Sequence, residues 1–158
     1  MSAPTLTDIL NEINIDPAGL GYSNVQGQYN EITDMLNDVT LGQPMPQPID
    51  MLSFAKWAAG NGTRQKLKDG QSNPTFGAIC DLAIDMFAQL GIVFDPVDPL
   101  TQDMMGALAE AGIIDQTADV AAAVTFCTQS ASRAANLWGW GVVITLDQVT
   151  AALTPPTI

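Results

Sequence analysis

The chain has 158 residues, of which 47% are hydrophobic and 14% are charged, and its formal net charge is −12. The length and the hydrophobic content exclude a chain that is disordered throughout and predict one domain over residues 1–158. The acidic balance repels phosphate backbones, which argues against a nucleic-acid partner. The low charged fraction indicates that part of the surface contacts another protein.

The first helix is predicted over residues 6–15, where apolar side chains recur at the spacing of one buried stripe. Thr5 or Thr7 is suited to cap this helix, because a threonine hydroxyl can accept from a backbone amide of the first turn. The same periodicity predicts a second helix over 28–39.

The segment DPAGLGY, residues 16–22, is predicted to form a stiff corner between these two helices. Proline disfavours helical geometry at the residue before it, and glycine is free to adopt positive φ. The tyrosine is placed to pack back over the corner. The residues assigned to the corner are Asp16, Pro17, Gly19, Gly21 and Tyr22.

A stiff, extended connector is predicted over 42–48, GQPMPQP, because it holds three prolines in seven residues. Helices follow over 51–59, capped by Asp50, and over 63–68. A longer helix is predicted from the Asn73-Pro74 pair to Leu90, where Gly91 stops it.

The last part of the chain predicts three further helices: one near 101–111, one from Asp115 to about Trp138, and a final one over 146–153 capped by Thr145. Residues 154–158 form a trailing tail. Apolar residues follow helical periods almost throughout, so the sequence predicts an all-α fold, a compact bundle of about six to eight short helices at mixed angles.

Cys80 and Cys127 each lie in an apolar helical pattern, which is typical of buried free thiols. The first ten residues, MSAPTLTDIL, carry no positive charge, and no apolar run approaches 18 residues in length. We therefore expect a chain that is made in a cytosol, stays soluble there and has no membrane partner.

The residue types needed for most catalytic sites are missing. The chain has no histidine, which excludes Ser-His-Asp and Cys-His sets and a histidine metal site. GNGTRQK, residues 60–66, lacks the spacing and the leading strand of a phosphate loop. We expect no catalytic residue and no cofactor.

Two groups of carboxylates are candidates for holding a cation. Asp81 and Asp85 stand four residues apart on a predicted helix, and three more aspartates crowd the loop at 95–103, namely Asp95, Asp98 and Asp103. Solvated helix faces and helix starts account for both groups, and the ligand ladder of an EF-hand is missing. We expect no metal site, and a calcium ion in the loop at 95–103 is the alternative.

Four of the five basic residues cluster between residues 56 and 68: Lys56, Arg64, Lys66 and Lys68. They form either a docking edge for the acidic face of a neighbour or a set of charges that neutralises nearby carboxylates. Trp57 is a candidate interface anchor, because tryptophan and arginine dominate binding hot spots, and a core residue is the alternative.

Arg133 is the only basic residue in the second half of the chain, so we expect it to pair with a carboxylate or a helix end. Trp138 and Trp140 flank Gly139, which together with Gly141 allows a sharp reversal into the last helix. We expect the two indoles to seal the bundle. An exposed pair would instead mark a contact surface.

The two ends of the chain together resemble a family of small tailed-bacteriophage proteins. Those proteins have an Asp-Pro-x-Gly-x-Gly-Tyr corner, then a helix with a Leu-Asn pair, here Leu36 and Asn37 in ITDMLND. Their closing Ser-Arg-Ala-x-x-Leu-Gly segment is similar to SRAANLWG, with matches at Ser132, Arg133, Ala134, Leu137 and Gly139. The chain departs by placing Trp138 before the glycine, and its middle is only loosely similar.

The resemblance implies a non-enzymatic virion structural protein with no catalytic residues to carry over. It implies a subunit of a head-tail connector or neck, or of another capsid- or tail-associated assembly, made in the host cytoplasm and located in the virion. Its partners would be copies of itself, in a homo-oligomer, and other virion proteins. The alternative is an acidic phage-encoded effector that binds and inhibits a basic host protein.

Overall fold

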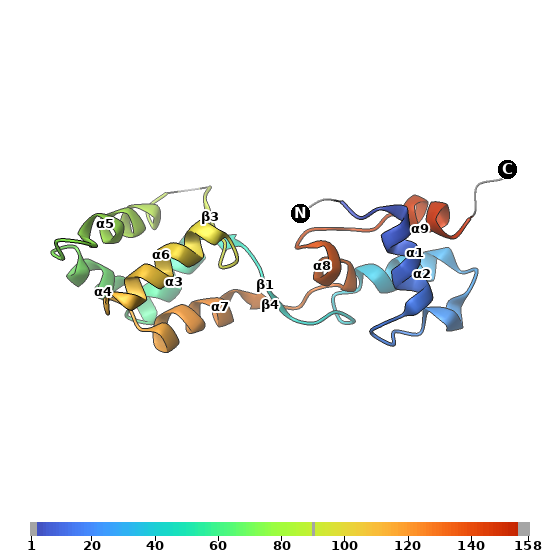
Figure 1. Ribbon diagram of the computed structural model, residues 1–158, viewed down its shortest axis with the longest axis horizontal. Helices are drawn as coiled ribbons and strands as arrows, with labels where there is room; N and C mark the ends of the chain where they lie inside the picture. Colours follow the sequence, from blue (N-terminus) through green and yellow to red (C-terminus); the bar gives the residue numbers. More distant parts are fainter. Residues whose placement is uncertain (1–2, 90, 155–158) are drawn as a thin grey trace. The chain divides into compact units, whose positions relative to one another are not determined.

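A computed structural model describes residues 3–89 and 91–154 of the chain (Figure 1). The structure is mainly helical, as predicted, with nine α-helices and a few two-residue strands among these residues. The predicted helix end at Leu90 and residues 155–158 of the predicted tail lie outside the described residues. No helix in the described ranges is long and apolar enough to cross a membrane.

The chain divides into two compact units. Unit 1 combines the two ends of the chain, residues 1–45 and 130–158, and unit 2 is the intervening segment 46–129. Unit 2 is thus inserted into the sequence of unit 1. The prediction of one domain over 1–158 did not include this subdivision, and it stays a prediction.

Unit 1 contains four α-helices and one turn of 3₁₀-helix among its described residues. These are α1 (Leu6–Ile15), η1 (Tyr22–Val25), α2 (Tyr29–Asn37), α8 (Arg133–Trp138) and α9 (Leu146–Leu153). In Figure 1 the blue helices α1 and α2 lie beside the red helix α9, although the sequence separates them by more than 100 residues. The bounds predicted for the first and last helices are confirmed.

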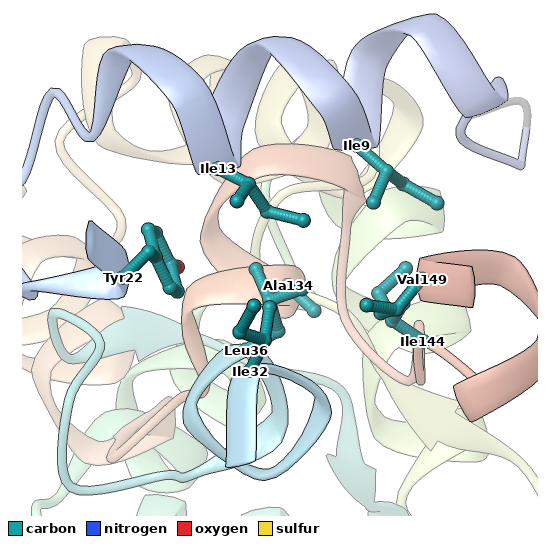
Figure 2. Packing of buried hydrophobic residues seen from close by; sticks show 8 residues of the cluster. All are labelled: Ile9, Ile13, Tyr22, Ile32, Leu36, Ala134, Ile144 and Val149. Atoms are coloured by element: carbon teal, nitrogen blue, oxygen red, sulfur yellow. The ribbon is translucent and has the colours of Figure 1, made fainter. Parts of the chain in front are cut away.

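The core of unit 1 is drawn from both ends of the chain. Figure 2 shows its buried side chains, which point toward one another from all of these elements: Ile9, Ile13, Tyr22, Ile32, Leu36, Ala134, Ile144 and Val149. Neither end of the chain can form this core alone, because α1 packs chiefly on α9 and α2 packs on both α8 and α9. The hydrophobic effect therefore holds the two ends together.

Capping residues fix where several helices begin. Thr5 and Asp8 form a capping box at α1, and Thr145 and Gln148 form one at α9. In each, the threonine hydroxyl accepts from the third backbone amide of the helix, and the side chain there returns the bond. Asp50 likewise caps the helix that follows it by accepting from the Ser53 amide at 2.9 Å.

Unit 2 is built mainly from short helices. Its elements are β2 (Ile49–Asp50), α3 (Met51–Gly60), α4 (Thr63–Gly70), α5 (Gly77–Met86), β3 (Val93–Phe94), α6 (Pro99–Glu110), the π-helical turn η2 (Gln116–Ala121), α7 (Ala122–Cys127) and β4 (Thr128–Gln129). β2 pairs antiparallel with β3, with Ile49 opposite Phe94. The connector at 42–48 also contains the two-residue strand β1 (Met45–Pro46), which the sequence analysis did not expect.

The core of unit 2 has an aromatic and methionine-rich part around Phe54 and an aliphatic part around Leu67. The Phe54 ring stacks on the Phe94 ring with a centroid separation of 3.6 Å. Cys80 and Cys127 are buried free thiols, as predicted. Burial raises the pKa of Cys127 to about 11, so this thiol stays protonated and unreactive at neutral pH.

Two predicted helices are wrong in extent. The helix predicted from Asp115 to Trp138 is interrupted at 128–132, where Ser132 adopts extended geometry and its hydroxyl caps α8 by accepting from the Ala135 amide. Serine and threonine compete with the helix for backbone hydrogen bonds, so the polar run TQS stops it. The helix predicted from Asn73 to Leu90 begins only at Gly77, because the Asn73 side chain accepts from two amides in a turn, and it already ends at Met86.

Polar contacts join the two ends of unit 1 at defined points. Asn136 exchanges two hydrogen bonds with the Gln43 backbone, at 2.6 and 2.8 Å. Gly42 precedes this contact, and a Cβ at that position would lie 2.1 Å from the Ala131 carbonyl oxygen. Only glycine fits so close an approach of two backbones.

Asn37 makes a second such contact, with the segment before α9. Its amide nitrogen donates to the Ile144 carbonyl at 2.7 Å, and its amide oxygen accepts from the Ile144 amide at 2.9 Å. Asn37 thereby pairs both backbone groups of a residue that is 1% exposed. The structure thus gives a physical role to one member of the Leu-Asn pair.

Asn37→Ala should lower the free energy of unfolding by about 1–3 kcal/mol, because it leaves the buried backbone groups of Ile144 without a partner. Urea unfolding followed by circular dichroism would measure the loss. Asn30→Ala is the matched control, since Asn30 lies exposed on the same helix. Equal effects of the two substitutions would contradict the assigned role of Asn37.

Candidate protein-interaction sites

The corner at 16–22 is held by Asp16. This residue ends α1 in the left-handed conformation, with φ 45°, and its carboxylate accepts from the Leu20 and Gly21 amides, each at 2.7 Å. Gly19 and Gly21 have positive φ, as predicted. The sequence analysis gave Asp16 only the geometry of a residue before proline and missed the turn that its side chain closes, although aspartate commonly forms such turns.

Tyr22 packs under the corner, as predicted, and is 1% exposed. Its ring lies in the unit 1 core (Figure 2), and its hydroxyl has no hydrogen-bond partner among the described residues. Burial, together with the nearby Glu12 carboxylate, raises the pKa of Tyr22 well above its usual range. The tyrosine therefore stays neutral and acts as a core residue of the corner.

Arg133 pairs with a carboxylate, as predicted, and the partner is Glu12 of α1. Two bonds join them, from Nε to Oε1 at 2.6 Å and from Nη2 to Oε2 at 3.0 Å. The side chains are 17% and 5% exposed, so both charges lie largely out of water. Hydrogen bonding to Glu12 raises the pKa of Arg133 above its usual value, so the guanidinium stays charged.

Sequence reasoning did not identify Glu12. One signal was available, because Glu12 shares the buried face of α1 with Ile9 and Ile13, three residues before it and one after it. A carboxylate on an apolar stripe needs a buried partner, and the chain offers one isolated arginine far along the sequence.

The two tryptophans of the closing segment differ in burial. Trp138 is partly buried against the unit 1 core, whereas Trp140 is 48% exposed. Gly139, with φ 108°, and Gly141, with φ 81°, make the reversal between them and the last helix. The prediction that both indoles seal the bundle is therefore wrong for Trp140, because the reversal turns its side chain outward.

The predicted basic cluster of unit 2 separates into two sets. The Lys66 ammonium contacts the Asp119 carboxylate at 2.5 Å and neutralises it. Lys56, Arg64 and Lys68 are exposed and form no ion pair with any carboxylate that the structure describes. We call these three residues the basic edge; they lie on α3 and α4, which pack against each other.

Asp119 is fully buried within η2, shortly before α7, and it joins that part of unit 2 to α4. Its carboxylate accepts from the Thr63 hydroxyl at 2.5 Å, from Lys66 and from the Asp115 amide at 2.7 Å. Burial alone would raise the pKa of Asp119, but these hydrogen bonds outweigh burial and hold the pKa below its ordinary value. Asp119 is thus an ionised carboxylate that accepts hydrogen bonds from the groups around it.

Trp57 lies beside the basic edge in a row of aromatic rings. It stacks on the buried Phe54 at a centroid distance of 5.2 Å and on Phe126 at 5.5 Å. Trp57 is partly buried, and Phe126 is 40% exposed. The indole therefore joins the core of unit 2 to its surface, and its assignment as an interface anchor stays a prediction.

Three of the five carboxylates considered for a cation make protein contacts. Asp81 accepts from the Gln71 side chain, Asp95 accepts from the Val97 amide, and Asp98 caps α6. Within residues 3–89 and 91–154, no three Cys, Asp or Glu side chains are grouped as a metal site requires.

Comparisons of the chain with known proteins find no match, whether with protein-family models, with curated proteins or with solved structures. The resemblance to phage proteins therefore stays a hypothesis, and a functional proposal has to rest on the surfaces and contacts of the two units.

Arg133→Met should lower the free energy of unfolding by about 3–5 kcal/mol, because it leaves the buried Glu12 carboxylate without a partner. Replacing both partners, with Glu12→Leu and Arg133→Met, should recover much of that loss. Chemical denaturation of four proteins, namely wild type, the two single variants and the double variant, measures the coupling. Glu31→Gln, on an exposed site, serves as control, and additive effects of the two paired substitutions would contradict a buried ion pair.

Asp119→Asn should lower the stability of unit 2 by about 1–3 kcal/mol at pH 7. The pKa of Asp119 in the folded state lies below its value in the unfolded chain, about 3.9. The ionised carboxylate therefore stabilises the fold in full above the unfolded pKa, and this stabilisation is lost as the pH falls through the folded-state pKa. The difference from wild type should shrink between pH 5 and about pH 2 in thermal unfolding. Asp103→Asn is the exposed control, and a difference independent of pH would refute the assignment.

Proposed function

We propose that this chain is a non-enzymatic structural protein of a bacteriophage virion. It acts as a subunit of a head-tail connector or neck, or of another capsid- or tail-associated assembly. Its partners are copies of itself and other virion proteins. As part of this proposal, each unit is a small all-α bundle with short helices at mixed angles, and the two-residue strands are local pairings.

One observation carries the proposal: the two segments that resemble the phage family lie in unit 1 and contact each other. The Asp16–Tyr22 corner ends α1, and Ser132 begins α8. The Glu12–Arg133 ion pair joins these two helices across 121 residues of sequence. The resemblance therefore concerns one folded body.

The residues that match the family pattern have structural roles in that body. Asp16 closes the turn, Gly21 supplies positive φ and Ser132 caps α8. Arg133 neutralises a buried carboxylate, and Asn37 pairs with the backbone before α9. A pattern of residues that build a scaffold is what a structural protein needs.

The surface of the chain supports contact with other proteins. Large apolar side chains are exposed in both units, among them Ile15 at 70%, Val143 at 67% and Leu100 at 77%. With a charged fraction of 14%, the chain has few charged side chains to surround these exposed apolar groups. Subunits of rings and lattices bury surfaces of this kind against their copies. The acidic effector remains the alternative, on the strength of the net charge of −12.

Mass spectrometry of purified virions tests the proposal. Particles made by the genome that encodes the chain should contain it at a stoichiometry typical of a ring or lattice protein. A phage-encoded cytosolic enzyme from the same infection should be absent and controls for carry-over. Absence of the chain from clean particles, with presence in the infected-cell lysate, would overturn the structural role and favour the effector.

A further inference from the structure

Both units have more carboxylates than basic residues, but unpaired cations among the described residues lie in unit 2. The one basic residue of unit 1 is Arg133, and its guanidinium is bound to Glu12. The remaining charges on the described surface of unit 1 are carboxylates, including Asp8, Glu31, Asp34, Asp38 and Asp147, all exposed. Unit 1 therefore offers acidic surface without an unpaired cation among its described residues.

Unit 2 also has exposed carboxylates, among them Asp69 and Asp103, but it carries the unpaired cations of the basic edge as well. Arg64 and Lys68 stand four residues apart on α4 and so share one helix face, and Lys56 lies on the adjoining α3. None of the three has an ion-pair partner in the part of the chain that the structure describes. Lys66, on the same helix, is paired with Asp119. The unpaired cations of the described residues are therefore Lys56, Arg64 and Lys68.

Apolar side chains accompany both charged surfaces. Next to the basic edge, Trp57 stacks on the half-exposed Phe126. On α2, Glu31, Asp34 and the capping residue Asp38 follow the spacing of one helix face, and the exposed Val39 and Leu41 come directly after them. An interface with an apolar centre and a charged rim needs apolar and charged side chains on both partners.

We propose that the basic edge of one copy docks on the acidic face of α2 in unit 1 of a second copy. This inference rests on the proposed function, because it names the contact through which the virion protein would assemble. Different surfaces of the two copies meet, so the contact is heterologous, and repetition closes a ring or continues as a filament. The chain supplies both surfaces, so no other partner is needed.

Charge reversal tests the contact. At 50 mM NaCl, sedimentation of the full chain should show reversible self-association, which weakens at 500 mM NaCl because salt screens surface charge. The basic-edge variant K56E/R64E/K68E and the acidic-face variant E31K/D34K/D38K should each associate at least about tenfold more weakly than wild type, because like charges then meet. The control D85K/D103K/E110K matches the second variant in charge change and should associate like wild type.

Mixing the two reversed variants provides the decisive measurement. The first then has acidic surfaces at both positions and the second has basic surfaces, so every contact between unlike molecules is again complementary. Association in the mixture should return to within a few-fold of wild type, with the two chains alternating. Circular dichroism of each variant alone should match that of wild type, which separates lost docking from lost folding.

Several outcomes would overturn the inference. The wild-type chain could stay monomeric at both salt concentrations, or the reversed variants could associate as strongly as wild type. The mixture of the two variants could fail to regain self-association. The basic edge could bind DNA in a chain that does not self-associate. The proposed function fails separately. A chain absent from virions that still shows charge-reversal rescue would refute the virion role and keep the contact, and a chain present in virions without rescue would do the opposite.

Discussion

The architecture of unit 1 depends on a hydrophobic core drawn from both ends of the chain, and the ion pair between Glu12 and Arg133 joins the same two ends. Two charges that are largely removed from water stabilise a fold only when each satisfies the other, and here both guanidinium–carboxylate bonds are made. The pair fixes α1 against α8, and Tyr22 packs in the same core. The core, the ion pair and the contact of Asn37 with Ile144 each join the two ends of the chain, so these ends form one scaffold.

Local signals in the sequence predicted the ends of helices better than their continuity. Thr5, Asp50 and Thr145 were identified as caps, because capping depends on residues within one turn. The break at 128–132 was missed although the polar run TQS lies there, because helical periodicity continues on both sides of the break. The division into two units has the same origin, because nothing local marks the return of the chain to unit 1 at residue 130.

The candidate sites were predicted in part for a similar reason. The basic cluster was visible from composition, but the burial of Asp119 is a long-range property, and it alone removes Lys66 from the set. In unit 1, the buried Glu12 likewise pairs with the one arginine. Each unit thus has an internal carboxylate that pairs with a basic residue, a long-range property that composition does not reveal.

The inserted position of unit 2 has a consequence for biosynthesis. Unit 2 is continuous in sequence and is made before α8 and α9, so its folding does not wait for them. Unit 1 has to wait, because α8 and α9 are made after the whole of unit 2. Until they emerge, the apolar face of α1 and the Glu12 carboxylate have no native partners, and the nascent N-terminal segment is a natural client for chaperones at the exit tunnel.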